Sequence, residues 1–153
     1  MKLWSGVLSP FSAKVRIALA EKKLGYETLV VPWSRQLEDE ADFAMVQEVT
    51  PLVQELFTKT EDASRDMARV AAASAALGRR YDALEKAPTG REYLCGTFSV
   101  ADIATFMVVG FASTFGVAPS DGHRSLRAWA DRVRARPSVA HEFETMTRAA
   151  AAV

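Results

Sequence analysis

The residue whose type and position most clearly suggest a chemical role is a serine at the start of a predicted helix. Ser9 is followed by Pro10, and this pair is typical of a helix that begins with a serine cap and a proline in its first turn. The backbone N–H groups at such an end, together with a hydroxyl, can stabilise an anion. Serine caps are common, however, so the residues alone favour a purely structural role for Ser9.

Cysteine, histidine and basic residues are weaker candidates. Cys95 is the only cysteine, which excludes an internal disulfide or a zinc site with several thiolates, and we expect it to be a small core residue. The two histidines, His123 and His141, are too few to suggest a metal site, so none is predicted. Lys14 and Arg16 are expected on a solvated helix face.

The composition excludes several classes of protein. The 153 residues are 49% hydrophobic and 25% charged, as in globular proteins, and 19 basic residues balance 19 acidic ones. This balance argues against a partner that is a nucleic acid. The uncharged run 103–118 is shorter than the roughly 20 residues of a membrane span, and no signal peptide is visible. We therefore expect a soluble, cytoplasmic protein that binds no membrane.

The first 33 residues predict a strand, a helix and a second strand. Residues 2–5 and 26–31 have strand character, and the helix between them begins at Pro10 and ends before Gly25. This order is a βαβ unit with parallel strands. One helical face is predicted to carry Phe11, Val15, Ala18 and Leu19. A parallel unit of two strands is too small to be stable alone, so we expect something else to complete it.

From Arg35 onward the hydrophobic period is helical. Helices are predicted from Leu37 to Leu56 with a kink or break at Pro51, from Met67 to Leu84, from Leu126 to Val133 and from Val139 to Met146.

The strongest local signal lies before one further helix. Ser99 and Asp102 form a capping box, and Phe98 and Ile103 occupy the two positions of a hydrophobic staple. The helix that follows should be the most buried one in the protein. Replacing Ser99 with alanine should cost about 1 kcal/mol through the lost cap.

Three segments of the chain together resemble the glutathione S-transferase family, including its bacterial members. Residues 2–6 and 9–21 resemble the first strand and helix of its thioredoxin-like domain, and residues 93–104 resemble the capping-box segment before its central helix. Residues 126–139 resemble its closing helices. The resemblance implies a mostly α fold: a truncated thioredoxin-like βαβ unit over residues 1–33, followed by an all-α C-terminal-like helical bundle over residues 35–153.

The sequence departs from the family after the second strand. The family continues with a helix, two antiparallel strands and another helix, which carry a cis-proline and an acidic residue–serine pair that hold glutathione. Here residues 31–34 lead directly into residues 35–40, which resemble the first helix of the all-helical domain. The second half of the thioredoxin-like domain is missing. If the chain is continuous, the Cα atoms of Ser34 and Arg35 lie about 3.8 Å apart.

The resemblance implies that the chemistry is thiol activation. A free thiol with a pKa near 8.5 is only about 3% thiolate at pH 7, whereas a pKa of about 6.5 makes roughly three quarters of it thiolate. Ser9 holds the place of the family's catalytic hydroxyl or thiol, and Ser12 is the alternative. Ser9, Phe11 and Ser12 are the residues expected to bind glutathione as co-substrate.

Three interpretations remain open at this stage. The first is an enzyme that conjugates glutathione to a small electrophile. The second is a degenerate, non-catalytic member that serves as a dimerisation or scaffold module. The third is that a longer protein carries a segment that this sequence lacks. A homodimer is expected, paired through the edge of strand 2–5 or through helix 35–57.

Overall fold

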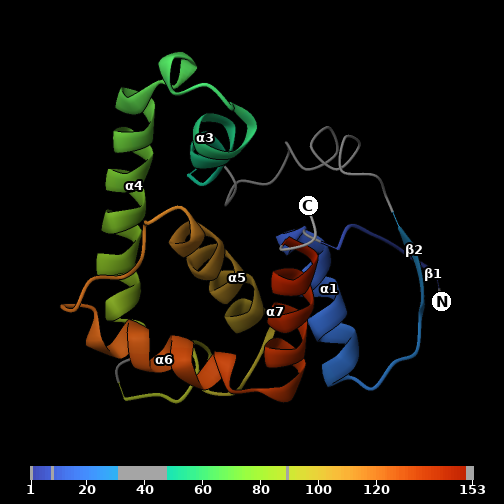
Figure 1. Ribbon diagram of the computed structural model, residues 1–153. Helices are drawn as coiled ribbons and strands as arrows, with labels where there is room; N and C mark the ends of the chain where they lie inside the picture. The colour runs from blue at the N-terminus through green and yellow to red at the C-terminus, as the bar shows by residue number, and fades with distance from the viewer. Residues whose placement is uncertain (1, 8, 31–47, 89, 151–153) are drawn as a thin grey trace.

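The described part of the chain is mainly helical, as predicted. A computed structural model describes residues 2–7, 9–30, 48–88 and 90–150 (Figure 1). The elements are β1 (Lys2–Ser5), α1 (Pro10–Glu21), β2 (Glu27–Val30), α3 (Thr50–Leu52), the π-helix η1 (Val53–Thr58), the 3-10 helix η2 (Asp62–Ser64), α4 (Met67–Glu85), α5 (Val100–Thr114), α6 (Arg124–Arg134) and α7 (Pro137–Ala150).

The two strands form a small parallel sheet, which confirms the predicted βαβ unit. Lys2 pairs with Glu27 and Ser5 pairs with Val30. The strands lie on the outer side of α1, away from α5 (Figure 1). Three of the four residues of β2 are exposed, so this strand buries little on either face.

The predicted start of α1 is confirmed, but its end lies earlier than expected. The helix ends at Glu21, and Lys23 adopts the left-handed conformation with a φ of 54°. The N–H of Lys23 bonds to the carbonyl of Ala20, and the N–H of Leu24 bonds to that of Leu19. This is a Schellman closure with a lysine where glycine is usual, so Gly25 is not the residue that ends the helix.

The inner face of α1 differs from the predicted one. Ala13 and Ile17 are buried and belong to the core, because α1 packs against α5 and α7. Val15 is 44% exposed. Apolar residues occur on nearly every side of this helix, so periodicity alone did not indicate which side meets the rest of the chain.

Helix α5 is the most buried helix among the described residues, as predicted. It packs against α1 and α6, and its buried residues are Asp102, Ile103, Phe106, Met107, Val109 and Ala112. The capping box of Ser99 and Asp102 is present. Gly110 lets α5 approach α7, since a Cβ there would lie 2.9 Å from Cζ of Phe143.

The other long helices lie at the predicted places, whereas the short 3-10 helix η2 was not predicted. Helix α4 packs against α3, η1 and α6, and α6 packs against α7. Glu85 at the end of α4 accepts the N–H groups of Ser125 and Leu126, both at 2.9 Å, and so caps α6. No described helix is long and apolar enough to cross a membrane.

Part of the prediction falls on residues that the structure does not describe. The helix expected to start at Arg35 and the junction of Ser34 with Arg35 lie within residues 31–47, outside the described part. Beyond that segment Pro51 stands in the first turn of α3, where a proline needs no N–H partner. The helical stretch then continues as the wider π-helix η1.

Candidate functional site

The candidate site is the N-terminal end of α1 and the loop that leads to it from β1. The Oγ of Ser9 accepts the N–H of Ser12 at 3.3 Å, which is the expected cap. The N–H of Ser9 donates to the carbonyl of Gly6 at 3.3 Å. Ser9 has no exposed surface, so its hydroxyl lies beneath the protein surface.

Ser12 occupies a more accessible place in the same end of the helix. It is half-buried, and its Oγ accepts the N–H of Gly6 at 3.2 Å. Its hydroxyl proton is not donated to any residue that the structure describes. Phe11 is also half-buried, with the ammonium of Lys14 4.5 Å from its ring centroid. The three residues predicted as the site therefore share one turn of helix, and Ser12 offers a donor.

An ion pair that the sequence analysis did not predict lies beside these serines. Arg16 was expected to be solvated, but its side chain is only 11% exposed and it pairs with Glu142 of α7, whose side chain is 7% exposed. Its guanidinium also bonds to the hydroxyl of Ser5 and to the carbonyls of Gly6 and Val7. Arg16 was assigned to a solvated helix face because it is charged, and no pattern connected it with a residue 126 positions later.

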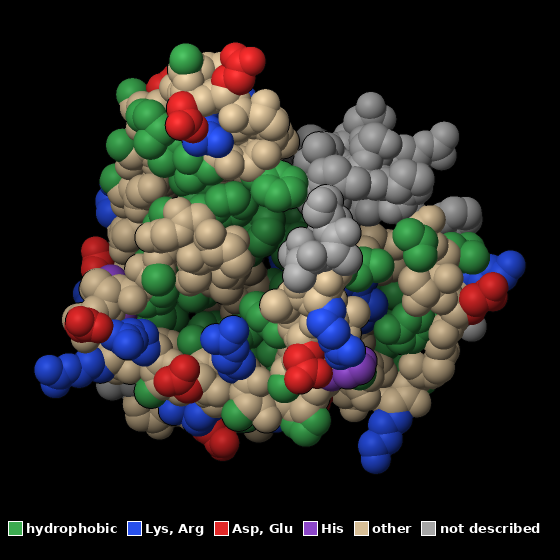
Figure 2. Space-filling model, in the orientation of Figure 1, with side chains coloured by type: hydrophobic (Ala, Val, Ile, Leu, Met, Phe, Trp, Pro, Cys, Tyr) green, Lys and Arg blue, Asp and Glu red, His purple; other side chains and the backbone are tan. Residues whose placement is uncertain are grey.

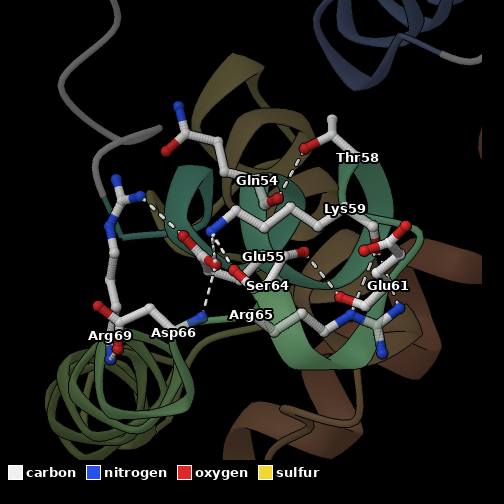
Figure 3. Close-up of polar contacts among 9 residues, drawn as sticks. All are labelled: Gln54, Glu55, Thr58, Lys59, Glu61, Ser64, Arg65, Asp66 and Arg69. Atoms are coloured by element: carbon white, nitrogen blue, oxygen red, sulfur yellow. Dashed lines mark hydrogen bonds and ion pairs between the residues drawn. The ribbon is translucent and has the colours of Figure 1, made fainter.

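A second polar cluster surrounds Glu55 in the first turn of η1 (Figure 3). The side chain of Glu55 is 2% exposed and accepts hydrogen bonds from Lys59 Nζ at 2.5 Å, the N–H of Asp66 at 2.8 Å and Arg69 Nη1 at 3.1 Å. The bond from Lys59, supported by those from Asp66 and Arg69, lowers the pKa of Glu55 to about 2. A carboxylate held this strongly in its charged form is suited to structure and not to proton transfer near neutral pH.

Cys95 is exposed, so the expectation of a core position was wrong. It lies in a tight turn in which Tyr93 bridges to Gly96 and Cys95 to Thr97. Tyr93 and Phe98 on either side pack against the core and contact each other edge to face. The two aromatic side chains, which are partly buried, thus contact the core in this segment, and the small thiol does not.

Charges of both signs mix on the surface. On the face in Figure 2, basic and acidic side chains alternate along the lower edge without forming a patch of one sign. Among the arginines near the C-terminus, Arg127 pairs with Asp121, and Arg136 pairs with Glu21. This distribution agrees with the zero net charge of the sequence.

The fold resembles solved glutathione transferases at low sequence identity. Glutathione transferase F7 from Populus trichocarpa matches with a TM-score of 0.74 and 15% identity, over 95% of this chain and 98% of that chain. Ure2p5 from Phanerochaete chrysosporium, cocrystallized with 1-(S-glutathionyl)-2,4-dinitrobenzene, matches with a TM-score of 0.72 and 17% identity, over 98% and 96%. The theta class enzyme from Xanthomonas axonopodis pv. citri, with glutathione bound, matches with a TM-score of 0.70 and 19% identity, over 92% and 95%.

The sequence gives a second, independent comparison. No curated protein matches the chain. The family model described as "Glutathione S-transferase, C-terminal domain" matches residues 41–137, which is more than half of the sequence. On this match, the chain belongs to the family of the glutathione S-transferase C-terminal domain.

Proposed function

We propose that this chain is a glutathione transferase that binds glutathione at the N-terminal end of α1 and conjugates its thiolate to a small electrophile. The observation that carries this proposal is the half-buried Ser12 hydroxyl, whose proton is donated to no described residue. The solved structures with glutathione or its dinitrophenyl conjugate support the choice of ligand. The family match supports the choice of reaction class.

The proposed chemistry needs little from the protein beyond stabilising an anion. The thiol of glutathione loses its proton to solvent, and the Ser12 hydroxyl donates a hydrogen bond to the sulfur anion. The positive end of the α1 dipole favours the same charge. The thiolate then attacks the electrophilic carbon, a C–S bond forms, and with an aryl halide the halide ion leaves. The buried Ser9 caps the N-terminus of α1 and fixes the turn that carries Ser12.

Replacing Ser12 with alanine is expected to lower kcat by about 100-fold, the usual effect of removing one donor to a developing or stabilised anion. The measurement is conjugation of glutathione to 1-chloro-2,4-dinitrobenzene, with calorimetric titration of glutathione on the same samples. Ser9→Ala is expected to lower turnover as well, and to cost about 1 kcal/mol of stability through the lost cap.

Ser64→Ala is the matched control, because Ser64 is exposed in η2 and far along the chain from α1. Its turnover should equal that of the unchanged protein. Normal turnover in both the Ser9 and Ser12 variants would remove these hydroxyls from the mechanism and leave them a capping role only. Absence of conjugation in the unchanged protein would contradict the proposed function itself.

A second candidate function is a non-catalytic module, and the burial of Ser9 favours it. Ser9 and Ser12 already satisfy backbone groups of the same turn, and the residues that would complete a thioredoxin-like domain are not in the sequence. Calorimetry separates the two candidates. An enzyme takes up glutathione with measurable heat, whereas a scaffold shows none while it still associates with its partner.

We also propose that the chain forms a homodimer. Among the described residues β1 pairs with β2 alone, and the βαβ unit carries exposed apolar side chains at Val15, Leu24 and Val30. Sedimentation at several concentrations should show a dimer that Val30→Lys weakens by about tenfold or more through the charge placed on this unit. Val100→Gln, at an exposed site on α5, should leave it unchanged. A monomer at every concentration would contradict the proposal.

The domain division and location complete the proposal. We propose that residues 1–33 form a partial thioredoxin-like unit, that residues 35–153 form the all-helical domain, and that the protein acts in the cytoplasm. The boundary between these parts falls within residues 31–47, outside the described part of the chain.

A further inference from the structure

We propose that Arg16 and Glu142 are positioning residues, which hold the loop between β1 and α1 so that the Ser12 hydroxyl meets a bound thiolate. The inference rests on the proposed function for its catalytic consequence. Its structural content, that a pair from α1 and α7 fixes the loop, can be tested separately. Neither residue needs to touch the substrate.

Arg16 contacts three consecutive residues at the end of β1 and directly after it, Ser5, Gly6 and Val7. Its Nη1 donates to the Ser5 hydroxyl and, at 3.0 Å, to the Gly6 carbonyl, while its Nη2 donates to the Val7 carbonyl at 3.2 Å. Ser5 is 1% exposed, so these contacts lie inside the protein. A planar guanidinium with several donors fixes the direction of such a loop more closely than an ammonium can.

Glu142 holds the other edge of the same guanidinium. Arg16 Nε lies 2.9 Å from Oε1 and 3.0 Å from Oε2 of Glu142, and Nη2 also bonds to Oε1. A buried pair with this geometry keeps both side chains in one orientation, because either charge alone would be costly to leave unpaired. The position of the guanidinium is thus set by α7, at the far end of the chain.

Gly6 connects this pair to both candidate serines. Its carbonyl accepts Arg16 Nη1 and also the N–H of Ser9. Its N–H donates to Ser12 Oγ, the hydroxyl proposed to face the thiolate. A shift of the Gly6 peptide would therefore change the acceptor contact that orients Ser12 and the bond that holds Ser9. A continuous series of hydrogen bonds therefore connects Glu142 in α7, through Arg16 and Gly6, to the candidate serines.

The test uses the full chain with two variants. Arg16→Lys keeps the positive charge but lacks the planar guanidinium with its several donors. Glu142→Gln keeps the shape of the side chain but removes its negative charge. Glu144→Gln is the matched control, since Glu144 lies two residues further on α7 in an exposed ion pair with Arg148. Amide hydrogen exchange is followed at Gly6, Ser9 and Ser12 and compared with the buried amides of α5. Conjugation is measured as kcat, KM for the electrophile and the pH profile of kcat.

Both pair variants should increase exchange at the amides of Gly6, Ser9 and Ser12 by about tenfold or more while α5 keeps its protection. They should lower kcat by about tenfold, as expected for a hydroxyl displaced by a fraction of an ångström, and should move the rising limb of the pH profile to higher pH. The KM for the electrophile should not change. The Glu144 control should behave as the unchanged protein.

The inference fails if the three amides keep their exchange rates, or if exchange rises equally throughout α5, which would indicate a general loss of stability. It fails in its catalytic part if the loop loosens while kcat and its pH profile stay the same. If the unchanged protein does not conjugate glutathione, the proposed function is lost, and the exchange data still decide whether the pair holds the loop.

Discussion

Replacing Asp102 with alanine is expected to lower the free energy of unfolding by about 4 kcal/mol, the largest loss expected of any polar side chain in the core. The Asp102 side chain has no exposed surface. Its Oδ1 accepts the N–H of Leu94 at 2.9 Å and the indole Nε1–H of Trp129 at 2.8 Å. Its Oδ2 accepts the N–H of Ser99 at 2.9 Å and the Ser99 hydroxyl at 3.1 Å. Alanine leaves all four donors without this acceptor.

The bond to Trp129 is the part of this network that joins separate elements. Trp129 belongs to α6, has no exposed surface and meets the ring of Phe106 edge-on at 6.4 Å. Asp102 therefore caps α5, fixes the turn at Leu94 and ties α6 to both. Chemical unfolding measures the loss directly, and a double-mutant cycle with Trp129→Phe isolates the coupling between the two side chains.

Two comparisons test the explanation. Ser99→Ala removes only the other half of the capping box and should cost about 1 kcal/mol. Asp121→Ala removes a fully exposed carboxylate and should change stability by less than about 0.5 kcal/mol. An Asp102→Ala loss no larger than that of Ser99→Ala would mean that the bonds to Leu94 and Trp129 contribute nothing.

The local part of this network could be predicted, and the long-range part could not. The spacing of Ser99 and Asp102 indicated a capping box because both partners lie within one turn. Nothing in the sequence indicated that the same carboxylate meets an indole 27 residues later. The same limit applies to the fold. The strands and the long described helices were predicted, whereas the 3-10 helix η2 was not, and the inward side of α1 depended on helices far along the chain.

The candidate site shows the same division. The serine cap of α1 follows from Ser9 and Pro10, and the structure places Ser12 in the same turn. Arg16 was misjudged because its partners are a loop before the helix and Glu142 after it, and neither is at helical spacing. The difference in burial between Ser9 and Ser12 could not be predicted either, because packing around the turn decides that Ser12 is the more accessible one.

Among the described carboxylates, Glu55 is expected to give the protein the most distinct dependence on acid. Its pKa is lowered from 4.5 to about 2, chiefly by the hydrogen bond from Lys59 and then by that from the Asp66 backbone. A carboxyl with a lowered pKa stabilises the fold fully above its ordinary value and loses this contribution as the pH falls through its folded value. The contribution of Glu55 should therefore be complete above about pH 4.5 and disappear near pH 2.

The variant that isolates this contribution is Glu55→Gln, which keeps the shape and one acceptor oxygen but removes the charge. Urea midpoints at several pH values should show a clear gap between the variant and the unchanged protein near neutral pH, closing between about 4.5 and 2. The comparison is needed because the pKa values of Glu21 and Glu85 are also lowered, by Arg136 and by the N-terminus of α6. Both proteins will therefore lose stability in acid for other reasons.

Glu61→Gln provides the matched control in the same segment, since Glu61 is exposed and its side chain takes no part in the hydrogen bonds of Glu55 (Figure 3). Its midpoint should follow the unchanged protein at every pH. A gap for Glu55→Gln that stays constant down to pH 2 would show that shape and not charge holds the cluster. Of the partners of Glu55, only Lys59, four residues away, stands at a spacing that a sequence pattern can indicate. Arg69 and the Asp66 backbone approach Glu55 because the π-helix η1 ends against the start of α4.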